Sequence, residues 1–119
     1  TPARLLRIYD DLCGLLELHR PQALVTERLF FSRNEATAFS VGRAIGVILL
    51  AGAPHGLPWV EYTPMQVKEA VVGYGAAEKR QVQFMVQRIL NLSAPPRPEH
   101  AADALAVAVC HAHMLRAEP

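Results

Sequence analysis

The spacing of apolar residues at the start of the chain predicts an α-helix. Leu5, Ile8 and Leu12 follow the helical period. Thr1 suits the N-cap position and is followed by proline at the first helical position. A proline at position 21 restricts the residue before it, so we expect the helix to end near His19.

Two short apolar segments predict β-strands. The segment 23–27 is apolar on both faces, as expected for a strand that helices cover from both sides. The segment 59–62 follows a turn rich in proline and glycine.

Helical patterns fill most of the remaining chain, and they alternate with the strands. We expect helices over 35–53, with Asn34 as the cap, and over 63–72, 76–90 and 99–116. Gly42, Gly46 and Gly52 inside the first of these would let another backbone approach closely. Strands separated by helices imply parallel pairing and an α/β fold, here as one domain over residues 1–119. Since two strands make a poor sheet, we expect further strands before Thr1.

Composition places the chain among folded soluble proteins. Hydrophobic residues make up 51% and charged residues 19% of 119 residues, and the formal net charge is +1. Nucleic-acid binding would therefore depend on local basic patches. Cys13 and Cys110 fall in apolar helical patterns and suggest buried thiols in a reducing compartment, with a disulfide as the alternative. No signal-peptide pattern is found, and the apolar run 47–50 lies in a segment that we expect to be shorter than the ~20 residues that span a bilayer; both favour a cytoplasmic protein.

Three side chains suggest metal chemistry. Glu27 ends an apolar strand, and ligands of open α/β sheets gather beyond the carboxyl ends of strands. Solvent exposure of Glu27, or pairing with Arg28 or Arg33, is an equally good interpretation. His100 and Asp103 share one face of a helix near its N-terminus, where the helix dipole favours an anion.

The metal hypothesis depends on whether Glu27 converges on the same point as His100 and Asp103. Without that, the helix pair is an ordinary acidic helix start with a surface histidine. Carboxylates suit Mg²⁺, and an imidazole shifts the preference toward Mn²⁺. Two such ions about 4 Å apart can activate water and stabilise the leaving oxygen in phosphodiester cleavage. One further acid should come from elsewhere.

Four segments resemble RuvC, the bacterial Holliday-junction resolvase with a ribonuclease-H-like fold. They occur in the right order and cover nearly the whole chain. They are VTERLFF at 25–31, the helix with Asn34 and VGRAIG at 41–46, MQVKEAVVGYGAAEK at 65–79, and HAADALA at 100–106.

The resemblance implies a mixed sheet flanked by helices, with the first three strands absent from this sequence. It also implies a site of four metal-binding side chains. Glu27 matches the glutamate of the fourth strand, and His100 and Asp103 match the pair on the last helix. The aspartate of the first strand has no counterpart here. The function implied is metal-dependent, paired and symmetric hydrolysis of Holliday junctions in recombination and DNA repair, with two Mg²⁺ or Mn²⁺ ions.

The resemblance also implies DNA contacts and protein partners. Lys68 and Lys79 match basic contacts of the family, and Phe30 is similar to an aromatic residue that stacks on an unpaired base. The alternatives are solvated lysines and a core phenylalanine. Arg80 flanks the same loop as the lysines, and Arg33 is a weaker candidate, as is Arg43.

A four-way junction is two-fold symmetric, so paired cuts call for two sites, as in a C2 homodimer. The segment 42–53 would form its interface; packing of this face within one chain is the alternative. A branch-migration motor of the RuvA–RuvB type is the further partner implied, and no membrane is expected. Two other functions stay open. The absent acid and the imidazole at position 100 favour a catalytically incomplete junction-binding domain, and the third alternative is a ribonuclease-H-like fold used for tRNA modification or ATP binding.

Overall fold

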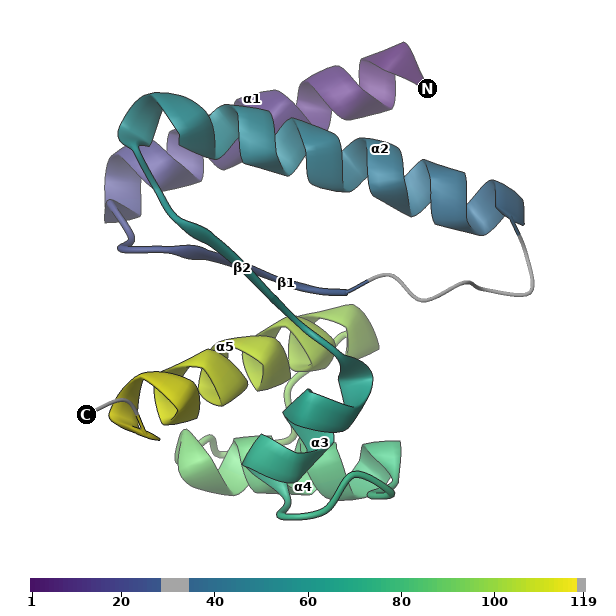
Figure 1. The fold of residues 1–119 in the computed structure, drawn as a ribbon, viewed down its shortest axis with the longest axis vertical. Helices are drawn as coiled ribbons and strands as arrows, with labels where there is room; N and C mark the ends of the chain where they lie inside the picture. Colours follow the sequence, from purple (N-terminus) through teal and green to yellow (C-terminus); the bar gives the residue numbers. More distant parts are fainter. Residues whose placement is uncertain (29–34, 118–119) are drawn as a thin grey trace. The chain divides into compact units, whose positions relative to one another are not determined.

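The computed structural model describes residues 1–28 and 35–117, and these form two compact units (Figure 1). Unit 1 takes in residues 1–24 and the described part of 29–60. Unit 2 takes in residues 25–28 and the described part of 61–119. The expectation of one domain across residues 1–119 stays a prediction.

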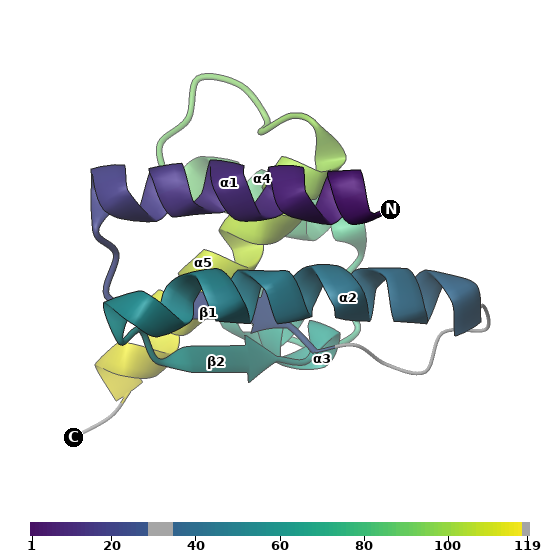
Figure 2. The ribbon, with the colours of Figure 1, turned by 90° about the horizontal axis from the view of Figure 1, so that it is seen from above.

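Unit 1 is built on two long helices. α1 (Pro2–His19) and α2 (Glu35–Gly52) lie side by side and run in the same direction (Figure 2). α1 ends where the sequence predicts, because Arg20 adopts the left-handed conformation and its N–H donates to the Leu16 carbonyl. A short 3-10 helix, η1 (Ala53–His55), follows α2.

The glycines of α2 differ in their surroundings. A Cβ at Gly52 would collide with the end of the Leu24 side chain, so a larger residue here would require that side chain to shift. At Gly46 a Cβ would meet nothing within 4 Å in the part of the chain that the structure describes. The neighbours of Gly52 are thus side-chain atoms, and among the described residues the predicted close approach of another backbone is seen at neither Gly46 nor Gly52.

α2 ends within one residue of the predicted position, but together with η1 it forms a longer apolar segment than the sequence pattern suggested. The segment Ala36–His55 has 20 residues and a mean hydropathy of 1.6, which is enough to cross a membrane by length and composition. The expectation that the segment around 47–50 is too short was therefore wrong, because η1 extends α2 without a break. One such helix is weak evidence for a membrane span, since helices of soluble proteins pass the same test.

The two strands form a two-stranded parallel sheet. They are β1 (Leu24–Glu27) and β2 (Trp59–Tyr62), close to the predicted bounds. At one end the Leu24 N–H donates to the Pro58 carbonyl at 2.9 Å, and at the other the Arg28 N–H donates to the Tyr62 carbonyl at 2.7 Å. Donor and acceptor are 34 positions apart in both bonds (58 − 24 and 62 − 28), which is the constant register of parallel strands. The predicted parallel pairing is confirmed.

Unit 2 packs three helices together: α3 (Pro64–Val71), α4 (Lys79–Ile89) and α5 (Glu99–Ala117). α3 begins with a capping box, in which Thr63 Oγ1 accepts from the Gln66 N–H at 3.1 Å and Gln66 Oε1 accepts from the Thr63 N–H at 2.8 Å. In α4, Gln81 Oε1 accepts from the Glu78 N–H at 2.8 Å. This cap makes Lys79 the first helical residue, so the predicted start at position 76 was three residues too early.

The core of unit 2 depends on small side chains along α5. Ala102, Ala106 and Cys110 recur every four residues and are all buried, so one face of α5 can press closely against its neighbours. Cys110 is fully buried, its Sγ donates to the Gln66 carbonyl at 3.7 Å, and burial raises the pKa of its thiol. Both cysteines are free, with Cys13 half-buried, so the disulfide alternative is not realised.

Candidate metal and nucleic-acid site

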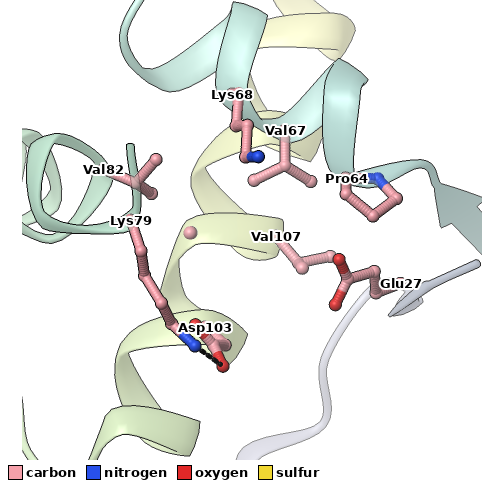
Figure 3. A pocket seen from close by; sticks show the side chains of 9 residues that line it. Glu27, Pro64, Val67, Lys68, Lys79, Val82, Asp103 and Val107 are labelled. Atoms are coloured by element: carbon pink, nitrogen blue, oxygen red, sulfur yellow. Dashed lines mark ion pairs between the residues drawn. The ribbon is translucent and has the colours of Figure 1, made fainter. Parts of the chain in front are cut away.

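Unit 2 contains a cavity of about 270 Å³ where the end of β1 meets α3, α4 and α5 (Figure 3). We call it the α5 cavity. Its charged lining consists of two carboxylates and two ammonium groups, and the rest is apolar. The lining residues are Glu27, Pro64, Val67, Lys68, Lys79, Val82, Asp103, Ala106 and Val107.

Glu27 brings its carboxylate to this cavity from the last position of β1 (Figure 3). Glu27 is an exposed residue, so the alternative of solvent exposure holds together with its place in the cavity lining. Partial desolvation of the carboxylate raises the pKa of Glu27, the negative charge of Asp103 raises it further, and Lys79 and Lys68 act in the opposite direction. The carboxylate therefore senses Asp103 across the cavity. Glu27 thus lies at the carboxyl end of β1, where the sequence analysis expected a ligand of an open α/β sheet.

Arg28 does not neutralise Glu27. Its Nε lies 3.1 Å from Glu61 Oε1, so the arginine is held by a residue of β2. Successive side chains of an extended segment point to opposite faces, which separates Arg28 from the cavity-facing side chain before it. The alternative in which Glu27 pairs with Arg28 is therefore not what the structure contains. Arg33, the other suggested partner, lies outside the described residues.

Asp103 comes from the second turn of α5 and lines the same cavity. Its Oδ2 lies 3.4 Å from Lys79 Nζ, and the same ammonium also pairs with Glu99 Oε1 (Figure 3 marks the Asp103 pair). Glu99 and Asp103 are four residues apart, so they share one face of the helix. The pKa of Lys79 is raised, first by its hydrogen bond with Glu99 and then by Asp103, although desolvation opposes this.

His100 is exposed and does not line the cavity, although it precedes Asp103 by three residues. Across residues 1–28 and 35–117, no group of three or more His, Cys, Asp or Glu side chains is arranged to hold a metal ion. Two of the three predicted ligands thus meet at one cavity in the structure, and the third lies outside its lining. The assignment of all three as metal ligands stays a prediction.

The predicted DNA contacts fall in different places. Lys68 and Lys79 line the α5 cavity. Arg80 points elsewhere: it is exposed, lies 3.9 Å from Glu78, and lines a second, mostly apolar cavity on α4 with Phe84. Phe30 lies outside the described residues, as does the weaker candidate at position 33. Their roles in DNA binding stay predictions.

Glu99 is the residue that the sequence interpretation left without a role. Its spacing from Asp103 was a usable signal, because carboxylates four residues apart on a helix can share one cation. The partner, Lys79, could not be read from that spacing, since it comes from another helix. The pKa of Glu99 is lowered, chiefly by its hydrogen bond with Lys79.

The donor set of the α5 cavity suits a hard divalent cation. Glu27 and Asp103 offer carboxylate oxygens, the ligands that such ions prefer. After desolvation, the negative charge of Asp103 is the next cause of the raised pKa of Glu27, so the two carboxylates repel each other. A cation between them would relieve that repulsion.

Comparison with known proteins places these residues in a family. The family model described as "Crossover junction endodeoxyribonuclease RuvC" matches residues 1–111. The protein of that name from Syntrophomonas wolfei is 56% identical over 115 residues, which is 97% of this chain and 67% of the relative. That from Desulfitobacterium hafniense is 53% identical over 112 residues, or 94% of this chain and 68% of the relative.

Two solved structures are also similar to this chain. One is described as "Thermus thermophilus RuvC structure", with a TM-score of 0.91 at 43% identity, covering 97% of this chain and 69% of the other. The second is described as "T. thermophilus RuvC in complex with Holliday junction substrate", with a TM-score of 0.93 at 43% identity, covering 97% of this chain and 70% of the other.

Proposed function

Because the chain belongs to the RuvC family, we propose that it serves a structure-specific endonuclease that resolves Holliday junctions by metal-dependent phosphodiester hydrolysis in recombination and DNA repair. The resemblance deduced from the sequence and the ribonuclease-H-like fold are both confirmed. One observation carries the proposal: the carboxylates of Glu27 and Asp103 line one cavity together with the ammonium groups of Lys68 and Lys79. That combination suits a site that must hold both a cation and a phosphate.

Nucleases of this family generally need divalent metal ions. Glu27 and Asp103 would hold such an ion through their carboxylate oxygens, with His100 as a further ligand from the same helix face as Asp103. Bound ions supply an activated water and stabilise the leaving oxygen of the phosphodiester. We propose two Mg²⁺ or Mn²⁺ ions per site.

The lysines of the cavity would position the DNA strand. An ammonium donates to phosphate oxygens without reading sequence, so Lys68 and Lys79 would set where the strand lies relative to the carboxylates. We propose that Arg80 extends this contact along the outside of α4, and that Arg33 is a further DNA contact. Phe30 would stack on an unpaired base, an interaction worth roughly 1–3 kcal/mol.

The substrate we propose is four-way junction DNA, cut by a homodimer whose two sites match the two-fold symmetry of the junction. Exposed apolar side chains on α2 support this pairing: Phe39 and Leu50, eleven residues apart, lie on the same side of the helix, and Val41 is exposed on another side. We further propose a cytoplasmic location in a bacterium and a motor partner of the RuvA–RuvB type.

A cleavage assay on a synthetic four-way junction tests the proposal. In the protein that contains this chain, Glu27→Gln and Asp103→Asn should abolish cutting in Mg²⁺ or Mn²⁺ while leaving junction binding intact, because each removes a carboxylate but keeps the side-chain shape. Glu69→Gln is the matched control, since Glu69 is exposed on α3 and does not line the cavity. Normal cutting by either cavity variant, or equal affinity for linear duplex and junction, would refute the proposal.

A junction-binding domain without catalytic activity is the second candidate. It is favoured by the absence, among the described residues, of a cluster of three potential metal ligands. Junction binding without any cleavage in either metal, by the unsubstituted protein, would establish this candidate instead.

A further inference from the structure

Lys79 pairs with one carboxylate that lines the α5 cavity and with one that does not. Its ammonium pairs with two carboxylates of α5, and the contact with Glu99 Oε1 is closer than the 3.4 Å to Asp103 Oδ2. Of these two acids, only Asp103 lines the cavity. The lysine therefore lies mainly with the acid that is not part of the proposed metal site.

The helix starts fix the backbone positions of Lys79 and Glu99. The side-chain conformations then determine how the Lys79 ammonium is divided between Glu99 and Asp103. Lys79 is the first residue of α4, held there by the cap at Glu78, and Glu99 is the first residue of α5. Each side chain in the two pairs is between 41% and 58% exposed. Ion pairs so open to water are weak, so the ammonium can change partners without disturbing the fold.

Sharing the lysine matters for any cation that binds at Asp103. A lysine held fully by Asp103 would compete directly with a divalent ion for that carboxylate. Glu99 offers the ammonium a second partner, one helical turn away and outside the cavity. The pairing with Glu99 therefore weakens the ion pair between Lys79 and Asp103, which would compete with a bound cation.

We propose that Glu99 is a positioning residue that draws the Lys79 ammonium away from Asp103 and so keeps this carboxylate open to a divalent cation. The inference rests on the metal site of the proposed function, and it adds a residue that does not itself touch the metal. Its effect passes through Lys79. Removing the lysine should therefore remove the need for Glu99.

The test is the affinity for Mn²⁺, measured from the electron paramagnetic resonance signal of the free ion without DNA, in the protein that contains this chain. Glu99→Gln keeps the size of the side chain but releases Lys79 to Asp103, so Mn²⁺ should bind about 2- to 5-fold more weakly, the range expected for exposed ion pairs. Lys79→Met should tighten binding by a similar factor. Glu99→Asp, which keeps the charge, should restore an affinity close to the original.

The Lys79→Met background separates positioning from a simple loss of negative charge. There, Glu99→Gln should change the Mn²⁺ affinity much less than it does in the original protein. An equal loss in both backgrounds, or no loss in either, would overturn the inference. Circular dichroism checks that each variant keeps its helices, and Glu69→Gln shows the effect of an exposed charge elsewhere in unit 2.

The outcomes also separate this inference from the proposed function. If the unsubstituted protein binds Mn²⁺ and cuts junctions while Glu99→Gln binds the ion equally well, only the role of Glu99 is wrong. If the unsubstituted protein neither binds Mn²⁺ nor cuts junctions, the proposed metal site is wrong, and the inference fails with it.

Discussion

The two lysines of the α5 cavity should contribute unequally to the salt dependence of junction binding. Lys68 forms no ion pair with any described residue, whereas Lys79 is paired with Glu99 and Asp103. Each phosphate neutralised by a lysine adds about 0.9 to the slope of log affinity against log salt concentration. Lys68→Met should therefore reduce the slope by about 0.9.

Lys79→Met should reduce the slope clearly less. Before Lys79 can bind a phosphate it must leave two carboxylates, and these take up cations from solution, which offsets the cations released from the DNA. The measurement is fluorescence anisotropy of a labelled four-way junction, titrated in EDTA at several NaCl concentrations. Arg7→Met is the control, because Arg7 lies on α1 and pairs with Asp11 at 3.8 Å.

Two results would contradict this reasoning. A slope reduced more by Lys79→Met than by Lys68→Met would mean that the ion pairs of Lys79 do not persist in solution. An unchanged slope in both variants would mean that neither lysine contacts a phosphate.

Three further predictions concern the core, the acid and the thiols of the protein. Val86→Ala should lower the free energy of unfolding by about 2 kcal/mol in a urea titration, because a fully buried side chain loses two carbons and leaves a small cavity; a loss under about 0.5 kcal/mol would mean that α4 repacks. Since the pKa of Glu27 is raised in the folded state, protonated Glu27 stabilises the fold below its ordinary pKa, and this contribution is lost as pH rises through the folded pKa. Glu27→Gln carries no such charge, so its stability relative to the original should increase as pH rises from below the ordinary pKa of glutamate through the raised folded-state pKa, and a difference that stays constant would contradict the shift. Cys110 is fully buried and Cys13 half-buried, so a thiol reagent should label Cys13 first under native conditions, and equal rates would contradict this order.

Local sequence signals predicted the strands and most helix ends. The segment 59–62 became β2 at the predicted bounds, and α1 ended at His19. The start of α4 was misplaced because the cap is set by one side chain, Gln81, whose hydrogen bond with Glu78 does not appear in a hydrophobic pattern. The bounds of α2 were predicted to within one residue, but the length of the apolar segment was underestimated because η1 extends it to His55.

The site was predictable only in part, and the reason lies in sequence distance. Glu27 and Asp103 could be expected at one sheet edge, from strand polarity and from the family resemblance. The pairing of Lys79 with Glu99 depends on how α4 packs against α5, and no local spacing encodes that. His100 has the helical spacing of a ligand yet lies outside the cavity lining, because spacing gives the helix face but not where the side chain ends.

The equal numbers of acids and bases in the α5 cavity bear on how DNA would arrive. The charges of two carboxylates and two ammonium groups nearly cancel, so the electrostatic field of the α5 cavity is weak at a distance. The cavity would therefore neither attract nor repel a polyanion strongly. The cavity itself would then add little to the dependence of the encounter rate on ionic strength. Discrimination between branched and linear DNA would have to reside in how slowly the correct complex comes apart.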